Sequence, residues 1–213
     1  MNREPMLLGY YNYTVILTYI GAITGLMGIV DALEGNCSGA VVCLMIAGFC
    51  DMFDGTIAST RQRTRRERCF GIQIDSLSDL ICFGVLPAVI VYQLNHHSQL
   101  VLGICALYVL CALIRLAYFN VDEQERQQNS TGPREIYYGL PVTLSALFVP
   151  LIFGACQMTS RRPGPALAAA LATMGMLFLM PVPLRKPKLI GKLCVLLCGA
   201  AEIMLVVLAL GDA

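Results

Sequence analysis

The chain has 213 residues, of which 57% are hydrophobic and only 14% are charged, and its mean hydropathy is +0.68. Soluble domains carry about 25% charged residues, so this composition excludes an ordinary soluble protein and indicates a membrane protein. The net charge of +1 provides no basic surface for capturing nucleic acid, and no nucleic-acid partner is predicted.

Seven stretches are long and apolar enough for membrane-spanning helices, which need about 20 apolar residues each. We therefore predict an all-α fold, a polytopic transmembrane helical bundle of about seven spans, with six to eight compatible with the sequence. The predicted spans cover residues 14–33, 38–59, 71–94, 98–119, 138–157, 164–182 and 189–210. No internal repeat or low-complexity segment divides the chain, so residues 1–213 are expected to form a single integral-membrane domain.

The basic residues fall almost entirely on one side of these spans. If the N-terminus is cytoplasmic, 13 of the 15 Lys and Arg residues lie in or next to the inner segments, and only Arg161 and Arg162 lie outside. Because cytoplasmic loops carry the excess of basic residues, this asymmetry predicts a cytoplasmic N-terminus. The expected location is the cell inner membrane, where membrane lipids surround the bundle.

Four aspartates interrupt the second and third predicted spans. Asp51 and Asp54 lie near the end of the second span, and Asp75 and Asp79 lie near the beginning of the third. Spacings of three and four residues place each pair on one helix face. Because a short inner loop makes the two helices antiparallel neighbours, we expect the four carboxylates to gather at the cytoplasmic end. Carboxylates are costly in hydrocarbon, so this group needs counter-charge.

Divalent cations are the expected counter-charge, because Mg²⁺ and Mn²⁺ prefer oxygen ligands. Two such ions about 4 Å apart can clamp a phosphoryl group during its displacement. The sequence therefore predicts a site for Mg²⁺ or Mn²⁺, with two ions per active site, on the cytoplasmic side. The predicted ligands are Asp51, Asp54, Asp75 and Asp79.

A divalent-cation carrier is an alternative reading of the same aspartates. Transport sites usually lie near the membrane midplane on broken helices. The two spans are expected to have no central Gly or Pro break, and their acidic residues lie toward one end, so a carrier is disfavoured.

The aspartates also lie in a pattern that resembles the signature of the CDP-alcohol phosphatidyltransferases. The pattern D-x-x-D-G-x-x-A, followed by G-x-x-x-D-x-x-x-D, reads DMFDGTIA (51–58) and GIQIDSLSD (71–79) here. The resemblance implies a membrane-embedded transferase that replaces the CMP of a CDP-linked lipid by an alcohol. Two departures are visible: Ser59 stands where the family usually has arginine, and the stretch from there to Gly71 is longer than usual. Arg61 and Arg63 are the candidates for the missing cation.

The resemblance assigns a role to each matching residue. It implies that Asp51, Asp54 and Asp75 bind metal, and that Asp79 completes the metal site and takes the proton from the attacking hydroxyl. Asp79 is thus the expected catalytic base. The residues expected to bind CDP are Thr18, Asp54, Gly55, Ala58 and Gly71. Members of the family are commonly homodimers, and a homodimer is implied here too.

Three further segments resemble the phosphatidylserine synthase branch of this family. They read DSLSDLICFGVLPA (75–88), IRLAYFNV (114–121) and YYGLPV (137–142). The branch implies that CDP-diacylglycerol and L-serine are the substrates, and that phosphatidylserine and CMP are the products.

A serine acceptor carries one carboxylate and needs one well-placed cation. Arg115 is the one basic residue clearly inside a predicted span, which makes it the candidate, and Tyr118 and Asn120 at the same level are expected to shape the pocket. The alternative role for Arg115 is a side chain that extends to the inner membrane interface. The alternative acceptor is glycerol 3-phosphate, whose phosphate would need two or more converging cations.

Overall fold

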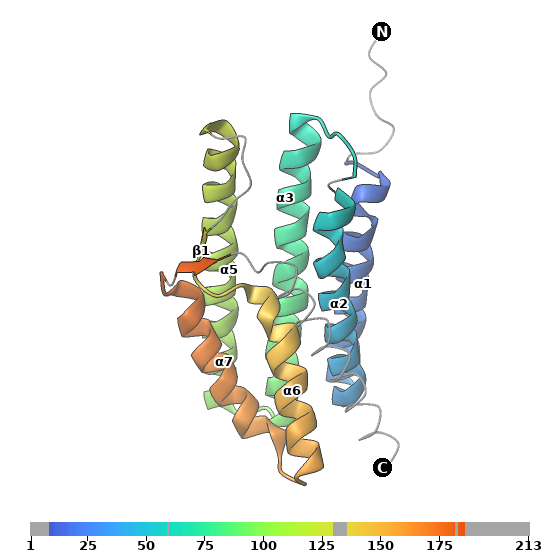
Figure 1. Cartoon of the computed structure of the whole chain (residues 1–213). Coiled ribbons are helices and arrows are strands. Elements are labelled where there is room, and N and C mark those ends of the chain that lie inside the picture. The colour runs from blue at the N-terminus through green and yellow to red at the C-terminus, as the bar shows by residue number, and fades with distance from the viewer. Residues whose placement is uncertain (1–8, 59, 130–135, 182, 186–213) are drawn as a thin grey trace.

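The structure of the chain, a computed structural model, describes residues 9–58, 60–129, 136–181 and 183–185. Helices dominate it (Figure 1). They are η1 (Tyr13–Val15), α1 (Ile16–Leu33), α2 (Cys37–Ala58), α3 (Arg65–Asp79), the π-helix η2 (Leu80–Val85), α4 (Leu86–Leu94), α5 (Gln99–Asn129), η3 (Val142–Leu144), α6 (Ser145–Met158) and α7 (Pro163–Leu179). Strands β1 (Ile136–Tyr138) and β2 (Pro183–Arg185) form a short antiparallel pair.

Four helical stretches are long and apolar enough to cross a membrane, which confirms the helical class and supports an integral membrane protein. They are Tyr13–Leu33, Cys37–Ala58, Arg65–Leu94 and Gln99–Glu125. The stretches Val142–Met158 and Pro163–Leu179 are shorter apolar helices. The predicted seventh span, 189–210, lies outside the described residues. About seven spans and a cytoplasmic N-terminus therefore stay predictions.

Three predicted spans have wrong boundaries: the fourth, 98–119, ends too early, since α5 continues to Asn129, and two others begin at the wrong residue. The third helix begins at Arg65 rather than at residue 71, because Thr64 and Glu67 form a capping box that starts the helix inside the basic loop. The fifth predicted span, 138–157, begins too early. Its first residues belong to β1, Gly139 adopts a positive φ of 78°, and the helix starts only after Pro141 and η3.

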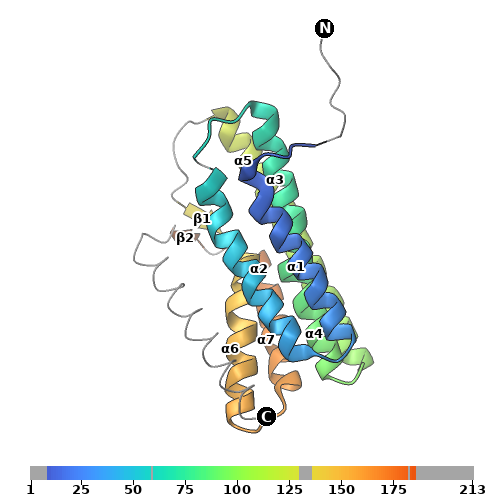
Figure 2. The same cartoon turned by 90° about the vertical axis from the view of Figure 1, so that its right-hand side faces the viewer.

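The helices pack so that α1 to α3 stand together at one side of the bundle. Helix α2 packs along α1, and the continuous helix of α3, η2 and α4 runs beside both (Figures 1 and 2). Helix α5 packs against α7, while α6 and α7 lie beside the lower half of the bundle as drawn in Figure 1. Asp51 and Asp54 lie on the last turns of α2, whereas Asp79 lies about midway along the continuous helix Arg65–Leu94, one turn before Phe83, whose carbonyl Ser145 of α6 contacts.

Close contact between α1 and its neighbours depends on glycines on one face of α1. Gly21, Gly25 and Gly28 are buried on this face. A Cβ atom on Gly28 would lie 2.8 Å from the Cβ of Cys43 and 3.0 Å from a methyl group of Leu86. Small residues let transmembrane helices approach closely and gain van der Waals contact. This face of α1 thus sets the distance between α1 and the two helices that carry the aspartates.

A π-helical segment directly follows Asp79. Pro87 has no N–H to donate to the carbonyl of Phe83, four residues earlier. That carbonyl instead accepts hydrogen bonds from the buried hydroxyls of Tyr108, at 2.7 Å, and Ser145, at 3.1 Å. The third span is nevertheless a single helix from Arg65 to Leu94, within which the π-helix η2 occupies Leu80–Val85.

The close approach at Gly28 predicts that Gly→Ala lowers stability at position 28 but not at position 103. Gly28→Ala should lower the stability of the detergent-solubilised protein by about 1–3 kcal/mol, because the added methyl group overpacks the contact with Cys43 and Leu86. Gly103→Ala is the matched control, since no described atom lies within 4 Å of the Cβ position there. Thermal unfolding of both variants tests this; an equal midpoint for the two would contradict the packing assigned to α1.

Candidate metal and nucleotide site

The structure brings the four aspartates together at one level of the bundle. Carboxylate oxygens of Asp51, Asp54 and Asp75 lie within 4.8 Å of one another. Asp79 joins these three in the lining of a small cavity between α1, α2, α3 and η2, which we call the carboxylate cavity. Its volume is about 10 Å³, which is roughly the space of a single water molecule. This cavity has room for an ion but not for a substrate.

The oxygen atoms of this cluster have the spacing of ligands around a cation. Metal–oxygen distances of about 2.0–2.6 Å place opposite ligands roughly 4–5 Å apart, which matches the separations among the three carboxylates. Carboxylate oxygens are hard donors that suit Mg²⁺, Mn²⁺ or Ca²⁺. The residues present therefore fit a divalent cation, and such a cation would neutralise like charges that repel one another.

Helix α1 contributes hydroxyl and carbonyl groups to the same site. The hydroxyl of Thr18 donates a hydrogen bond to Asp54 Oδ2, at 3.2 Å. Ser78, next to Asp79, donates to the carbonyl of Thr18 at 3.3 Å, and the thiol of Cys82 donates to the carbonyl of Gly21 at 3.2 Å. These bonds fix the carboxylate-bearing helix against α1, so the positions of Asp54 and Asp79 depend on α1 as well as on their own helices.

A second, larger cavity opens beside the carboxylates toward the loop between α2 and α3. We call it the loop-side cavity; its volume is about 150 Å³. All five residues predicted to contact CDP line it, and Asp75 is shared with the carboxylate cavity. Its lining comprises Thr14, Val15, Thr18, Asp54, Gly55, Ala58, Arg63, Arg68, Gly71, Ile72 and Asp75. The residues of the sequence pattern therefore line two adjoining cavities, which share Thr18, Asp54 and Asp75.

The two glycines of the pattern keep this cavity open. A Cβ atom on Gly55 would meet nothing within 4 Å, so the backbone of α2 is accessible there. A Cβ atom on Gly71 would lie 3.1 Å from Nη1 of Arg63, so a side chain at position 71 would displace that guanidinium. Glycine at position 71 therefore makes room for an arginine at the edge of the cavity.

Two arginines, Arg63 and Arg68, line the loop-side cavity, and only Arg63 was a candidate from the sequence. Of the two candidates for the missing cation, Arg63 lines the cavity, whereas Arg61 forms an ion pair with Glu67 at 3.5 Å. Arg68 was not predicted. Its spacing of four residues from Ile72 and seven from Asp75 places it on the same helix face, and this periodicity could have identified it. Ser59 lies outside the described residues.

The residues predicted to bind the acceptor are not brought to the carboxylates by their described contacts. The buried guanidinium of Arg115 donates to the carbonyls of Leu140 and Gly139, each at 3.4 Å. Tyr118 is 61% exposed. Asn120 accepts a hydrogen bond from Ser76 at 2.7 Å and lines a separate cavity between α3 and α5. Arg115 thus joins α5 to the segment before α6.

Comparison with known proteins agrees with this geometry. A sequence model of the family described as CDP-alcohol phosphatidyltransferase matches residues 11–182. The CDP-diacylglycerol–serine O-phosphatidyltransferase of Saccharomyces cerevisiae is 32% identical over 141 residues, which cover 62% of this chain and 50% of the relative. The archaetidylserine synthase of Methanothermobacter thermautotrophicus is 28% identical over 152 residues, which cover 70% of this chain and 60% of that protein.

A bacterial relative matches over more of its length. The CDP-diacylglycerol–serine O-phosphatidyltransferase of Bacillus subtilis is 27% identical over 179 residues, or 83% of this chain and 90% of the relative. The chain therefore spans only about half to three fifths of the yeast and archaeal proteins, but most of the bacterial one. The family match includes the aspartate pattern and both cavities, and the chain belongs to the CDP-alcohol phosphatidyltransferase family.

Proposed function

We propose that the protein transfers the phosphatidyl group of CDP-diacylglycerol to L-serine, which gives phosphatidylserine and CMP. The observation that carries this proposal is the junction of the two cavities. The carboxylate cavity, whose aspartates suit divalent cations, shares Thr18, Asp54 and Asp75 with the loop-side cavity, which Arg63 and Arg68 also line. The names of the yeast and Bacillus relatives support serine as the acceptor.

The metal site is proposed to comprise Asp51, Asp54, Asp75 and Asp79, with Mg²⁺ or Mn²⁺ as the cation and two ions per site. When bound, the cations supply charge neutralisation for the diphosphate and for the leaving CMP. The protein's part is to hold the ligands in place. Thr18 fixes Asp54 by its hydrogen bond, and η2 anchors the helix just beyond Asp79.

Asp79 is proposed as the general base. The hydroxyl oxygen of the acceptor attacks the phosphorus that carries the diacylglycerol group and forms a new P–O bond there. The bond from this phosphorus to the CMP oxygen breaks, and CMP leaves with the bonding electron pair. The hydroxyl proton passes to Asp79, which lies at the closed end of the site beside α1.

The loop-side cavity is proposed to hold the CDP part of the lipid. Gly55 and Ala58 leave room for the nucleotide along α2, and Gly71 leaves room along α3. Arg115 stays the proposed partner of the acceptor carboxylate, because it is the one arginine among the buried described residues. Tyr118 and Asn120 stay proposed neighbours of that acceptor.

Three wider features belong to the same proposal. The aspartates are proposed to face the cytoplasm at the inner membrane, which the basic residues of the segment 61–68 support. Residues 1–213 are proposed to act as one domain, and two copies are proposed to form a homodimer within the membrane lipids, as the family resemblance implies.

The reaction predicts that the purified protein releases CMP from CDP-diacylglycerol only when both a divalent cation and L-serine are present. Removal of the cation with EDTA should abolish release, and Mg²⁺ or Mn²⁺ should restore it. Glycerol 3-phosphate in place of serine is the control acceptor. Cation-dependent release with glycerol 3-phosphate but not serine would contradict the proposed acceptor, and no release with any alcohol would contradict the reaction.

If Asp79 is the general base, its replacement should slow turnover without weakening the binding of CDP-diacylglycerol. Asp79→Asn should lower kcat roughly 10²–10⁴-fold, because a general base contributes that much, while the Kd for CDP-diacylglycerol changes little. Asp31→Asn is the matched control, since Asp31 lies near the other end of α1. Turnover of Asp79→Asn within twofold of the unaltered protein would show that Asp79 is not the base.

A further inference from the structure

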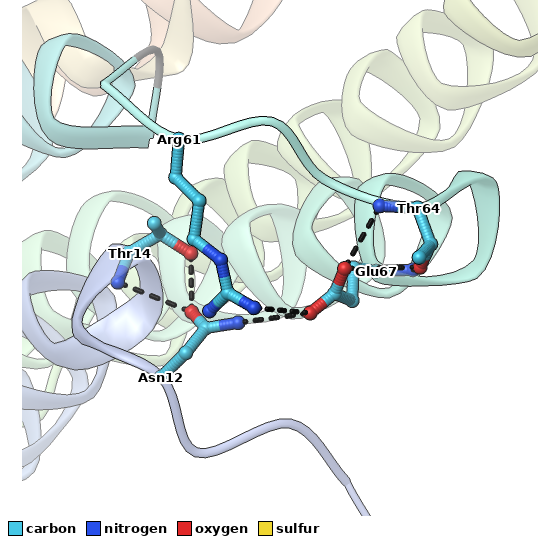
Figure 3. A network of polar contacts seen from close by, with 5 residues as sticks. All are labelled: Asn12, Thr14, Arg61, Thr64 and Glu67. Atoms are coloured by element: carbon cyan, nitrogen blue, oxygen red, sulfur yellow. Dashed lines mark hydrogen bonds and ion pairs between the residues drawn. The ribbon is translucent and has the colours of Figure 1, made fainter.

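One carboxylate, that of Glu67, holds the loop between α2 and α3 in place. Figure 3 shows the Glu67 network, which consists of Asn12, Thr14, Arg61, Thr64 and Glu67. Glu67 accepts hydrogen bonds from the backbone N–H and the hydroxyl of Thr64, at 2.8 and 3.0 Å. It also accepts one from the Asn12 amide at 3.3 Å and pairs with Arg61 at 3.5 Å.

The Glu67 network joins elements that are far apart in the sequence. Asn12 is oriented by Thr14, whose backbone N–H donates to Asn12 Oδ1 at 3.1 Å and whose hydroxyl donates to the same atom. A second contact parallels it, because the hydroxyls of Tyr13 and Thr60 lie 3.1 Å apart. The start of α1, the loop and the start of α3 are thereby fixed to one another around the rim of the loop-side cavity.

Three arginines near the Glu67 network differ in their contacts: Arg61 pairs with Glu67, whereas Arg63 and Arg68 line the loop-side cavity. Arg61 is bound to Glu67, whose side chain is only 12% exposed. Arg63, two residues later, lines the loop-side cavity, and its Nη1 lies 3.1 Å from the position of a Cβ atom on Gly71. Arg68 follows Glu67 directly and lines the same cavity. Glu67 thus binds one of these three arginines, and the other two line the cavity.

A cavity that holds a diphosphate beside aspartates needs cationic side chains as well. A diphosphate carries negative charge that the carboxylates of Asp54 and Asp75 would repel. Guanidinium groups bind phosphate oxygens through paired, charge-assisted hydrogen bonds. Arg63 and Arg68 line the same described cavity as Asp54 and Asp75, so the cavity offers guanidinium groups to an anionic diphosphate beside the proposed metal ligands.

We propose that Glu67 is a positioning residue for the CDP-linked substrate: by binding Arg61 and Asn12, it leaves Arg63 to bind the diphosphate together with Arg68. This proposal rests on the proposed function for the identity of the ligand. Glu67 itself does not touch the substrate. Its effect on binding passes through Arg63, and that dependence gives the test.

A double-mutant cycle on KM for CDP-diacylglycerol tests the proposal. Arg63→Gln should raise this KM roughly tenfold or more, because a hydrogen bond to a charged group contributes about 1.5–3 kcal/mol. Glu67→Ala should raise it by a smaller factor, and should have no further effect in the Arg63→Gln background. KM for serine should stay within twofold throughout. Arg66→Gln, an exposed arginine on the first turn of α3, is the control for net charge.

Two outcomes would overturn the proposal. One is a Glu67→Ala effect of full size in the Arg63→Gln background, which would mean that Glu67 acts independently of Arg63. The other is an Arg63→Gln effect no larger than that of Arg66→Gln. If Glu67→Ala unfolds the protein, Glu67→Gln replaces it, because glutamine preserves the capping box while it removes the charge that binds Arg61.

Calorimetric binding of CDP in the presence of Mn²⁺ separates this inference from the proposed function. If Arg63→Gln weakens CDP binding while the unaltered protein turns over no alcohol, the diphosphate role stands and the proposed reaction fails. If turnover with serine is normal and Arg63→Gln binds CDP as well as the unaltered protein does, the proposed reaction stands and the role of Arg63 and Glu67 fails.

Discussion

Mutual repulsion among four carboxylates at one end of an apolar bundle is the constraint on which the other features of the site depend. Asp51, Asp54 and Asp75 have oxygens within 4.8 Å of one another, and Asp79 lines the same small cavity. Such an arrangement is costly beside hydrocarbon unless cations neutralise it. The cluster is therefore suited to bind metal ions. It adjoins a cavity lined by arginines, which are suited to bind a phosphate-bearing ligand.

The rest of the bundle positions this cluster through close and polar packing. The buried glycines of α1 let α2 and α4 approach closely, and Thr18 and Gly21 exchange hydrogen bonds with residues around Asp54 and Asp79. Beyond Asp79, Tyr108 and Ser145 satisfy the carbonyl that Pro87 leaves without its helical partner. The π-helix is therefore stabilised by α5 and α6, and distant helices contribute to the geometry of the aspartates.

The lengths of the apolar stretches were sufficient to locate six helical segments, with errors at their ends, and the spacing of the aspartates was sufficient to predict that they gather. Spacings of three and four residues fix which side chains share a face, whatever the surroundings. Periodicity could not predict η2, because a π-segment depends on hydrogen bonds from Tyr108 and Ser145, far along the chain. It also left Arg61 and Arg63 equivalent, because only the ion pair between Arg61 and Glu67 in the folded chain distinguishes them.

The binding of Mn²⁺ to the purified protein, followed by electron paramagnetic resonance, tests the central claim most directly. If the four carboxylates form the metal site, the unaltered protein should immobilise Mn²⁺, and Asp51→Asn and Asp54→Asn should each weaken this binding at least tenfold. Added CDP should strengthen Mn²⁺ binding in the unaltered protein, because the diphosphate is proposed to bind beside the same ions. Equal Mn²⁺ binding by the unaltered protein and both variants would contradict the account.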